Sequence, residues 1–112
     1  MARNTRLVSI KGCPMVIFEA PECISDEIVK YNNFWEYEVF DKWKQHFPKE
    51  GLMLDIGANI GTQSVYLALS KIFKKIIAIE PDLFNYKLLK KNITDNNLSN
   101  IITPFNIAIG HC

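Results

Sequence analysis

The sequence lacks the long hydrophobic runs that would place it in a membrane. No stretch approaches the roughly 18–20 consecutive apolar residues that a spanning helix needs. The N-terminal MARNTRLVSIKG carries charges, and Lys11 and Gly12 interrupt it before it reaches the length of the apolar core of a signal peptide. We therefore expect a chain without a membrane partner, located in the cytoplasm.

The net charge is also small, and cysteines are few. With 13 basic and 12 acidic residues the formal net charge is +1, so no strong field would attract nucleic acid or anionic lipid. The three cysteines, Cys13, Cys23 and Cys112, show no CxxC spacing. This pattern predicts reduced thiols and argues against a disulfide framework or a metal site.

What the sequence does have is enough apolar material for a core. It is 112 residues long and 48% hydrophobic, which is typical of one globular unit and not of a disordered chain. No repeat, low-complexity tract or flexible linker divides it. We expect a single partial domain with three sections: N-terminal strands at 1–24, a helical lead-in at 25–50, and a βαβαβ half at 51–112.

The first half of the chain predicts a hairpin followed by helices. LVSI and MVIFEA are two short strand-like runs that flank a Lys-Gly-Cys-Pro turn. Ser25, followed by two acidic residues, is the expected N-cap of a helix. Further on, four apolar residues recur every four positions and predict one helix with a core-facing stripe: Trp35, Val39, Trp43 and Phe47.

The second half alternates between buried strands and helices. LMLDIG, KIIAIE and IITPFNIAIG are expected strands, and the helices between them run over about 62–73 and 82–92, with Asp82 as a cap. Pro104 makes the start of the third strand irregular or places this strand at the sheet edge. Right-handed βαβ units make the sheet parallel, so we predict an α/β fold with strand order 3-2-1 and helices on both faces.

The turn after the first of these strands favours a ligand with little phosphate. A dinucleotide fingerprint needs a glycine where this chain has Asn59, between Gly57 and Gly61. A phosphate-binding loop of the Walker type needs a Lys-Ser/Thr pair, and Thr62 is followed by Gln63 instead. The turn is nevertheless suited to the close approach of some ligand.

Glu80, at the end of the second strand, narrows the choice of ligand. In this topology a carboxylate at that place reaches the neighbouring ligand and can accept hydrogen bonds from both ribose hydroxyls. A free ribose diol without a pyrophosphate indicates an adenosine ligand such as S-adenosylmethionine.

These same stretches resemble a known family. LMLDIGANIGTQSVYLA, KIIAIEPDLFNYKLLKKNI and NIAIG are similar to the FkbM family of S-adenosylmethionine-dependent methyltransferases, in which DIGANIG and IEP are typical motifs. ISDEI and Trp35-Glu36 also resemble the segment before the family's glycine loop, so the resemblance covers roughly Ser25 to Gly110. It implies a Rossmann-like class I methyltransferase fold, here partial, with S-adenosylmethionine as the cofactor.

The resemblance also implies roles for five residues of the turn and the neighbouring strand. Asp55 would help to hold the methionine ammonium group, directly or through water. The loop beneath the methionine and the ribose would consist of Gly57, Asn59 and Gly61. Glu80 would bind the ribose hydroxyls.

Three further residues would complete the cofactor site. By the same resemblance, Pro81 would flank the adenine, Ile107 would lie beside its ring, and Glu36 would face the methionine end. Family members methylate mainly hydroxyls, often of sugars or natural products, so the implied acceptor is a sugar or small-molecule hydroxyl. A complete sheet of this family has further strands, which carry the acceptor pocket, so no catalytic residue is predicted in this chain.

Three interpretations of the function remain open. The chain is an O-methyltransferase of FkbM type or its cofactor-binding part, an inactive truncated cofactor-binding module, or a fragment of a nicotinamide-dependent oxidoreductase, which Asn59 disfavours. Individual residues also have plainer readings: the glycines could serve only packing, Glu80 could be a solvated strand end, and Asp55 could bind loop amides. Finally, the LMLDI strand would be left at a sheet edge, which predicts self-association.

Overall fold

The computed structural model describes residues 4–19 and 21–110. In order along the chain, the elements are β1 (Thr5–Ile10), β2 (Cys13–Phe18), α1 (Cys23–Tyr31), α2 (Tyr37–Trp43), the 3-10 helix η1 (Lys44–His46), β3 (Gly51–Ile56), α3 (Thr62–Leu69), β4 (Phe73–Ile79), α4 (Leu83–Asp95) and β5 (Ile102–Phe105). Within those two ranges, no helix is both long and apolar enough to cross a membrane.

The larger sheet has the predicted topology. Its three strands lie in the order β3-β4-β5, and both neighbouring pairs are parallel. The α/β class and the strand order 3-2-1 are therefore confirmed. Pro104 lies in β5, the edge strand of four residues, where its missing N–H costs no ladder hydrogen bond on the outer side.

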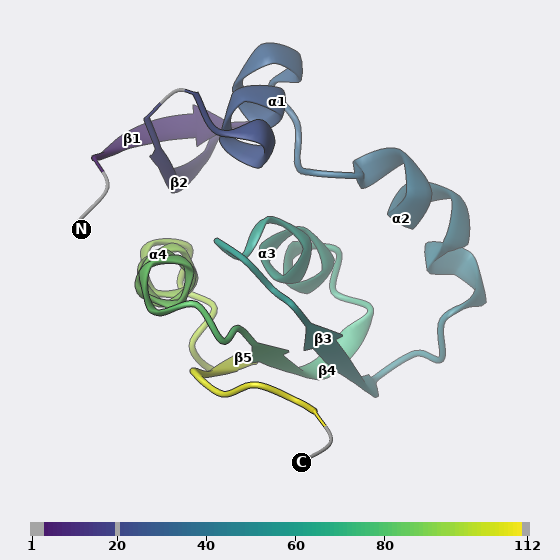
Figure 1. The fold of residues 1–112 in the computed structure, drawn as a ribbon. Helices are drawn as coiled ribbons and strands as arrows, with labels where there is room; N and C mark the ends of the chain where they lie inside the picture. The colour runs from purple at the N-terminus through teal and green to yellow at the C-terminus, as the bar shows by residue number, and fades with distance from the viewer. Residues whose placement is uncertain (1–3, 20, 111–112) are drawn as a thin grey trace.

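The prediction that helices cover both faces of this sheet is wrong. Figure 1 shows α3 and α4 on the same side of the three strands. The reason is handedness: both crossovers are right-handed and both move the chain in the same direction across the sheet, so they place their helices on the same face. The opposite face carries Leu52, Leu54 and Ile56 of β3, whose side chains are 66%, 52% and 58% exposed.

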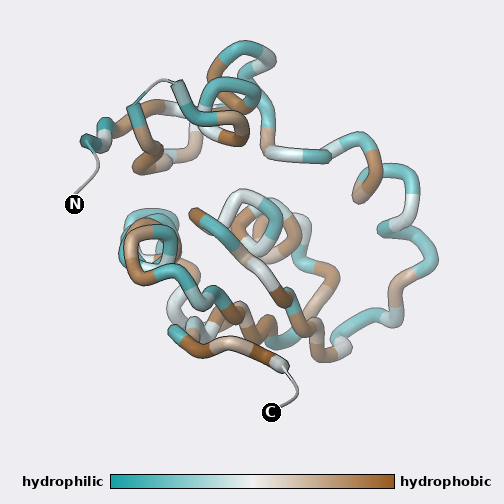
Figure 2. Tube along the Cα trace, in the orientation of Figure 1, coloured by the Kyte–Doolittle hydropathy of each residue, from teal (hydrophilic) through white to brown (hydrophobic). Residues whose placement is uncertain are grey.

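The hydrophobic core lies between the sheet and these two helices. Hydrophobic residues are concentrated along the three strands, at the bottom of the view in Figure 2. Ile76 and Ala78 of β4 are fully buried, as are Val65 and Leu67 of α3 and Leu89 of α4. α3 packs against the central strand β4 and α4 packs against its neighbour β5, so the core extends across both strands.

The N-terminal hairpin forms as predicted, but the helix after it begins earlier than expected. β1 and β2 pair as an antiparallel two-stranded sheet. The cap of α1 is Glu22, whose carboxylate accepts hydrogen bonds from the backbone N–H groups of Ile24 and Ser25. Ser25, the predicted cap, is fully buried, and its hydroxyl accepts the N–H of Phe18 instead. The long carboxylate side chain of Glu22, three residues upstream, takes the place of the short side chain that capping preferences favour.

The predicted helical stripe does not form one buried face. Its four members are Trp35, Val39, Trp43 and Phe47. Glu36 adopts a left-handed backbone conformation with φ of +56°, so the helix can start only at the next residue, and it ends seven residues later. Val39 and Trp43 are 49% and 51% exposed, whereas the Phe47 ring packs against Phe73 with centroids 5.4 Å apart. The four residues spaced four positions apart therefore lie in three different local structures and not on one helix.

Two of the cysteines fall within the described residues. Cys13 at the start of β2 is partly buried and Cys23 at the start of α1 is exposed, and both are free thiols. Cys112 lies outside the described residues, so the prediction about it is not tested.

One buried side chain joins the hairpin to the rest of the fold. Asn92 of α4 is fully buried, its Oδ1 accepts the N–H of Val16 at 2.6 Å, and its Nδ2 donates to the carbonyls of Val16 at 3.0 Å and of Ile60 at 2.7 Å. A single amide thus links β2, α4 and the turn before α3. Because Asn92 begins an Asn-Ile-Thr triplet, its burial also excludes it as a glycosylation acceptor in the folded chain.

We predict that Asn92→Leu, which keeps most of the side-chain volume, lowers the free energy of unfolding by about 2–4 kcal/mol, because it leaves buried backbone groups without partners. Urea unfolding monitored by circular dichroism measures the loss. Thr94→Ala, on the exposed side of the same helix, is the matched control and should change stability by less than about 0.5 kcal/mol. Equal stability of the two variants would contradict the proposed link.

Candidate cofactor site

The candidate site lies where β3 and β4 end and the chain turns into α3. The strands are parallel, so their carboxyl ends meet at one edge of the sheet, which is where ligands of open α/β sheets bind. The backbone N–H groups of Gly57 and Ala58 both donate to the carbonyl of Ile79, at 2.8 and 3.0 Å. These bonds fix the start of the glycine turn against the end of β4.

Glu80 directly follows β4 and is 4% exposed, so it is not a solvated strand end. Its Oε1 accepts the N–H of Asn59 at 2.8 Å, and its Oε2 accepts the N–H of Asp82 at 2.9 Å. The carboxylate therefore joins the glycine turn to the N-terminus of α4. Each carboxylate oxygen has two acceptor positions, so each retains capacity for a second donor.

The two glycines of the turn are needed for different reasons. At Gly57, with φ of +78°, a Cβ atom would meet nothing within 4 Å, so the space beside it is open. At Gly61, with φ of +95°, a Cβ atom would lie 2.8 Å from Cδ1 of the fully buried Leu89. The packing interpretation thus applies to Gly61, whereas Gly57 leaves room for a ligand beside the turn. Asn59 between them also has a positive φ, of +53°.

Asp55, on β3, faces the helix side of the sheet and is 5% exposed. Its Oδ2 accepts the hydroxyl of Ser64 in α3 at 2.5 Å, so its partner is a side chain and not a loop amide. Burial raises the pKa of the Asp55 carboxyl, the Ser64 hydrogen bond lowers it, and the nearby charge of Glu80 raises it again. The balance of these effects favours the protonated form more than in an exposed aspartate.

Glu36 lies on the segment between α1 and α2, and this segment is tied to the start of α3. Its Oε1 accepts a hydrogen bond from Nε2 of Gln63 at 3.1 Å. The neighbouring Trp35 donates its backbone N–H to the hydroxyl of Thr62 at 2.7 Å. The structure therefore brings Glu36 to the first turn of α3, next to Gly61, although the two are 25 residues apart (61 − 36).

Pro81 and Ile107 lie at the same edge of the sheet. Nδ2 of Asn106 donates to the carbonyls of Glu80 at 2.9 Å and of Pro81 at 3.0 Å, which ties the segment after β5 to the segment after β4. Ile107 itself lies beyond the end of β5 and is 50% exposed, so it is not part of the strand that the sequence predicts.

The structure thus gathers the sequence-predicted residues at one edge: Asp55, Gly57, Asn59, Gly61, Glu80 and Pro81 from the two strand ends, Glu36 from the α1–α2 segment, and Ile107 from the segment after β5. Sequence reasoning missed Ser64 and Asn106, which hold Asp55 and the 106–107 segment in place. The only signal for Ser64 was its position in the first turn of the helix after the glycine turn, and nothing marked Asn106.

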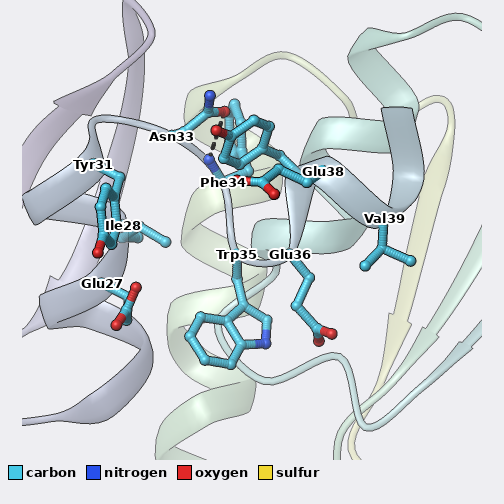
Figure 3. A pocket seen from close by; sticks show the side chains of 10 residues that line it. Glu27, Ile28, Tyr31, Asn33, Phe34, Trp35, Glu36, Glu38 and Val39 are labelled. Carbon is cyan, nitrogen blue, oxygen red and sulfur yellow. Dashed lines mark hydrogen bonds between the residues drawn. The ribbon is translucent and has the colours of Figure 1, made fainter. Parts of the chain in front are cut away.

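A cavity of about 420 Å³ adjoins this site between α1 and α2. It shares Glu36 with the residues above, and Figure 3 shows the Trp35 and Glu36 side chains pointing the same way from the connecting segment, with Glu27 opposite on α1. Aromatic and acidic residues predominate among the lining residues, and none of them is basic. The cavity therefore does not suit an anionic ligand.

Comparison with known proteins supports the fold. No protein-family model and no curated protein matches the chain. Among solved structures, a Pyrococcus horikoshii protein described as a transferase matches with a TM-score of 0.70 and 22% identity, over 96% of this chain and 37% of that one. P. horikoshii TYW2 in complex with MeSAdo matches with a TM-score of 0.65 and 21% identity, over 96% of this chain and 37% of that one. Methanocaldococcus jannaschii TYW2 in complex with AdoMet matches with a TM-score of 0.64 and 23% identity, over 93% of this chain and 43% of that one.

The match to the family named from the sequence is weaker. An FkbM methyltransferase from Methylobacillus flagellatus KT is 30% identical over 55% of this chain and 18% of that one. Its TM-score of 0.45 is too low to support a structural conclusion. The better matches are below 25% identity and show the fold alone: this chain has the Rossmann-like α/β arrangement of those structures, and spans 37% to 43% of their length.

Proposed function

We propose that this chain binds S-adenosylmethionine and forms the cofactor-binding part of a methyltransferase. The observation that carries the proposal is the Glu80 carboxylate, which the backbone N–H groups of Asn59 and Asp82 hold beside the open space at Gly57. A fixed carboxylate with spare acceptor capacity suits a ribose diol, and a turn with Asn59 in place of the middle glycine suits a ligand without a pyrophosphate.

Each residue of the site has a role in this proposal. The Glu80 oxygens accept the ribose hydroxyls, and the turn at Gly57 and Asn59 lies beneath the ribose and the methionine. Asp55 attracts the ammonium group, directly or through water. Pro81 and Ile107 flank the adenine. Two features support this arrangement. The hydrogen bonds of Asn106 bring Pro81 and Ile107 to the same edge of the sheet. Glu36 lies at the first turn of α3, near the place proposed for the methionine end.

The finer proposal is that the reaction is methylation of a hydroxyl on a sugar or small molecule, as in FkbM-type enzymes. The motifs DIGANIG and IEP support the family, and the cavity between α1 and α2 supports a neutral acceptor, since it is lined by aromatic and acidic side chains. The bound cofactor supplies a methyl group on a good leaving group, so the protein contributes mainly alignment of the acceptor oxygen and exclusion of water.

Two alternatives differ in what they predict. An inactive binding module retains the cofactor site but transfers no methyl group, which incubation with labelled S-adenosylmethionine and a panel of sugar and polyol acceptors would reveal. A nicotinamide-dependent oxidoreductase fragment would bind NAD instead. Asn59 argues against the second alternative, because its side chain occupies the place of the glycine that a pyrophosphate needs.

We predict that the chain binds S-adenosylhomocysteine but not NAD, and that Glu80→Ala weakens binding of S-adenosylhomocysteine by about 1.5–3 kcal/mol through loss of charge-assisted hydrogen bonds. Isothermal titration calorimetry with both ligands measures this. Glu19→Ala, which removes an exposed carboxylate outside the site, is the control and should bind normally. Preference for NAD, or unchanged affinity in Glu80→Ala, would refute the proposed site.

A second prediction uses two glycines in the same backbone conformation. Gly57 and Gly12 have φ of +78° and +80°, and a Cβ atom at either would meet nothing within 4 Å. Replacing each by leucine therefore imposes a similar backbone strain of about 1–2 kcal/mol. Gly57→Leu should abolish S-adenosylhomocysteine binding by filling the space beside the turn, whereas Gly12→Leu should lose only stability. Equal affinities in the two variants would place the ligand elsewhere.

A third prediction concerns Asp55, whose raised pKa makes its ionisation unfavourable for folding. Its contribution to stability is full below the ordinary aspartate pKa and is lost as the pH rises through the higher pKa of the folded state. Asp55→Asn, which still accepts the Ser64 hydroxyl, should therefore be more stable than the wild type at pH 7, with the difference vanishing in acid. The same variant should bind S-adenosylhomocysteine more weakly, because it cannot attract the ammonium group. Thermal unfolding at several pH values and calorimetry measure the two effects, and a variant that is less stable at pH 7 would contradict the first.

A further inference from the structure

Two serines at the two ends of α3 use their hydroxyl groups differently. Ser70, directly after the helix, donates to the carbonyl of Tyr66 four residues earlier, at 2.9 Å. This is the local bond that serines in helices usually make. Ser64, in the first turn, is fully buried and donates instead to Oδ2 of Asp55 on β3, at 2.5 Å. The hydroxyl of Ser64 is therefore engaged with the candidate cofactor site and not with its own helix.

The bond from Ser64 fixes the rotation of the Asp55 carboxylate. Ser64 lies three residues after Gly61 (64 − 61), the last glycine of the turn, so the helix that begins at this turn also holds the carboxylate. Each carboxylate oxygen has two acceptor positions, so a carboxylate that accepts one hydroxyl retains capacity for an ammonium group. The orientation of Asp55 toward a ligand is thus set by the same segment that would lie beneath that ligand.

A second carboxylate, that of Glu80, acts on Asp55 from the neighbouring strand. Asp55 is opposite Ala78 in the parallel pair of β3 and β4, and Glu80 follows two residues later (80 − 78), on the same side of the sheet. Burial raises the pKa of the Asp55 carboxyl, the hydrogen bond from Ser64 lowers it, and the charge of Glu80 raises it again. The helix packed on this side, α3, has the sequence TQSVYLAL and carries no charge. Of these effects, only the bond from Ser64 favours the charged form of Asp55, which is the form that attracts an ammonium group.

We propose that Ser64 is a positioning residue, which orients the Asp55 carboxylate in its charged form and so makes the site select ligands with an ammonium group. The inference rests on the proposed cofactor site, and it adds to that site the residue that determines recognition of the amino-acid end. In this role Ser64 acts through Asp55, without a contact to the ligand of its own. A merely structural bond between β3 and α3 would instead support every ligand of the site equally.

The first test compares two ligands that differ only in the ammonium group: S-adenosylhomocysteine and its desamino analogue, in which a hydrogen atom replaces that group. In isothermal titration calorimetry the wild type should prefer S-adenosylhomocysteine. Ser64→Ala should reduce the ratio of the two affinities about tenfold, because a charge-assisted hydrogen bond is weakened. Ser70→Ala, the same substitution at the other end of α3, is the matched control and should keep the wild-type ratio. Equal ratios in the two variants would overturn the proposal.

The second test establishes whether Ser64 acts through Asp55. In the Asp55→Asn variant the side chain at position 55 carries no charge, so adding Ser64→Ala should leave the ratio of the two affinities unchanged. Both ligands are measured on the same protein, so a smaller folded fraction of the double variant cancels in the ratio. A further decrease of the ratio in the double variant would show that Ser64 acts by another route, and would also overturn the proposal.

The pH dependence of the same ratio separates positioning from a loss of stability. The preference for the ammonium ligand requires ionised Asp55, so it is present above the pKa of this carboxyl and is lost below it. Removal of the Ser64 hydroxyl removes the effect that lowers this pKa, so the preference of Ser64→Ala should return only at a higher pH than in the wild type. An unchanged midpoint, or a normal ratio at every pH, would refute the role of Ser64 alone. Absence of S-adenosylhomocysteine binding by the wild type would refute the cofactor site and this role with it.

Discussion

The Glu80 carboxylate is the interaction on which the candidate site depends. It accepts one backbone N–H from the glycine turn and another from the start of α4, so the loops after two neighbouring strands are held by one side chain. A buried carboxylate is stable only with such hydrogen bonds. The same two bonds orient the carboxylate toward the edge of the sheet, so the group that would recognise a ribose is positioned by the loop that would lie beneath it.

The sequence predicts the part of the fold that local chemistry determines. The alternation of apolar strands and helices gave the βαβαβ order, Asp82 does cap α4, and the positions of Gly57, Gly61 and Glu80 follow from the turn and strand pattern. What it could not predict depends on contacts between distant residues or on single backbone conformations. Ser25 is buried against β2 and does not cap a helix, and Glu36 has a left-handed conformation that delays α2. Neither is marked by local propensity.

The choice of the sheet face that the helices cover is another feature that the sequence pattern did not predict. Periodicity predicts that both helices pack on the sheet, but the face follows from the direction in which the crossovers proceed, and two successive crossovers in the same direction place both helices together. On the side of the sheet that carries the helices, the hairpin is held to α4 by a long-range hydrogen bond, which joins Val16 and Asn92 across 76 residues. An asparagine in a polar-looking helix segment gives no sign of this role, which requires β2 to lie beside it.

The same asymmetry is present within the strand β3, because its odd and even positions face opposite ways. On the helix side, Asp55 is buried against Ser64 and belongs to the candidate cofactor site, while Leu52, Leu54 and Ile56 form the exposed apolar row. A substitution at one of the exposed positions therefore changes the uncovered face of the sheet without reaching Asp55 or the glycine turn.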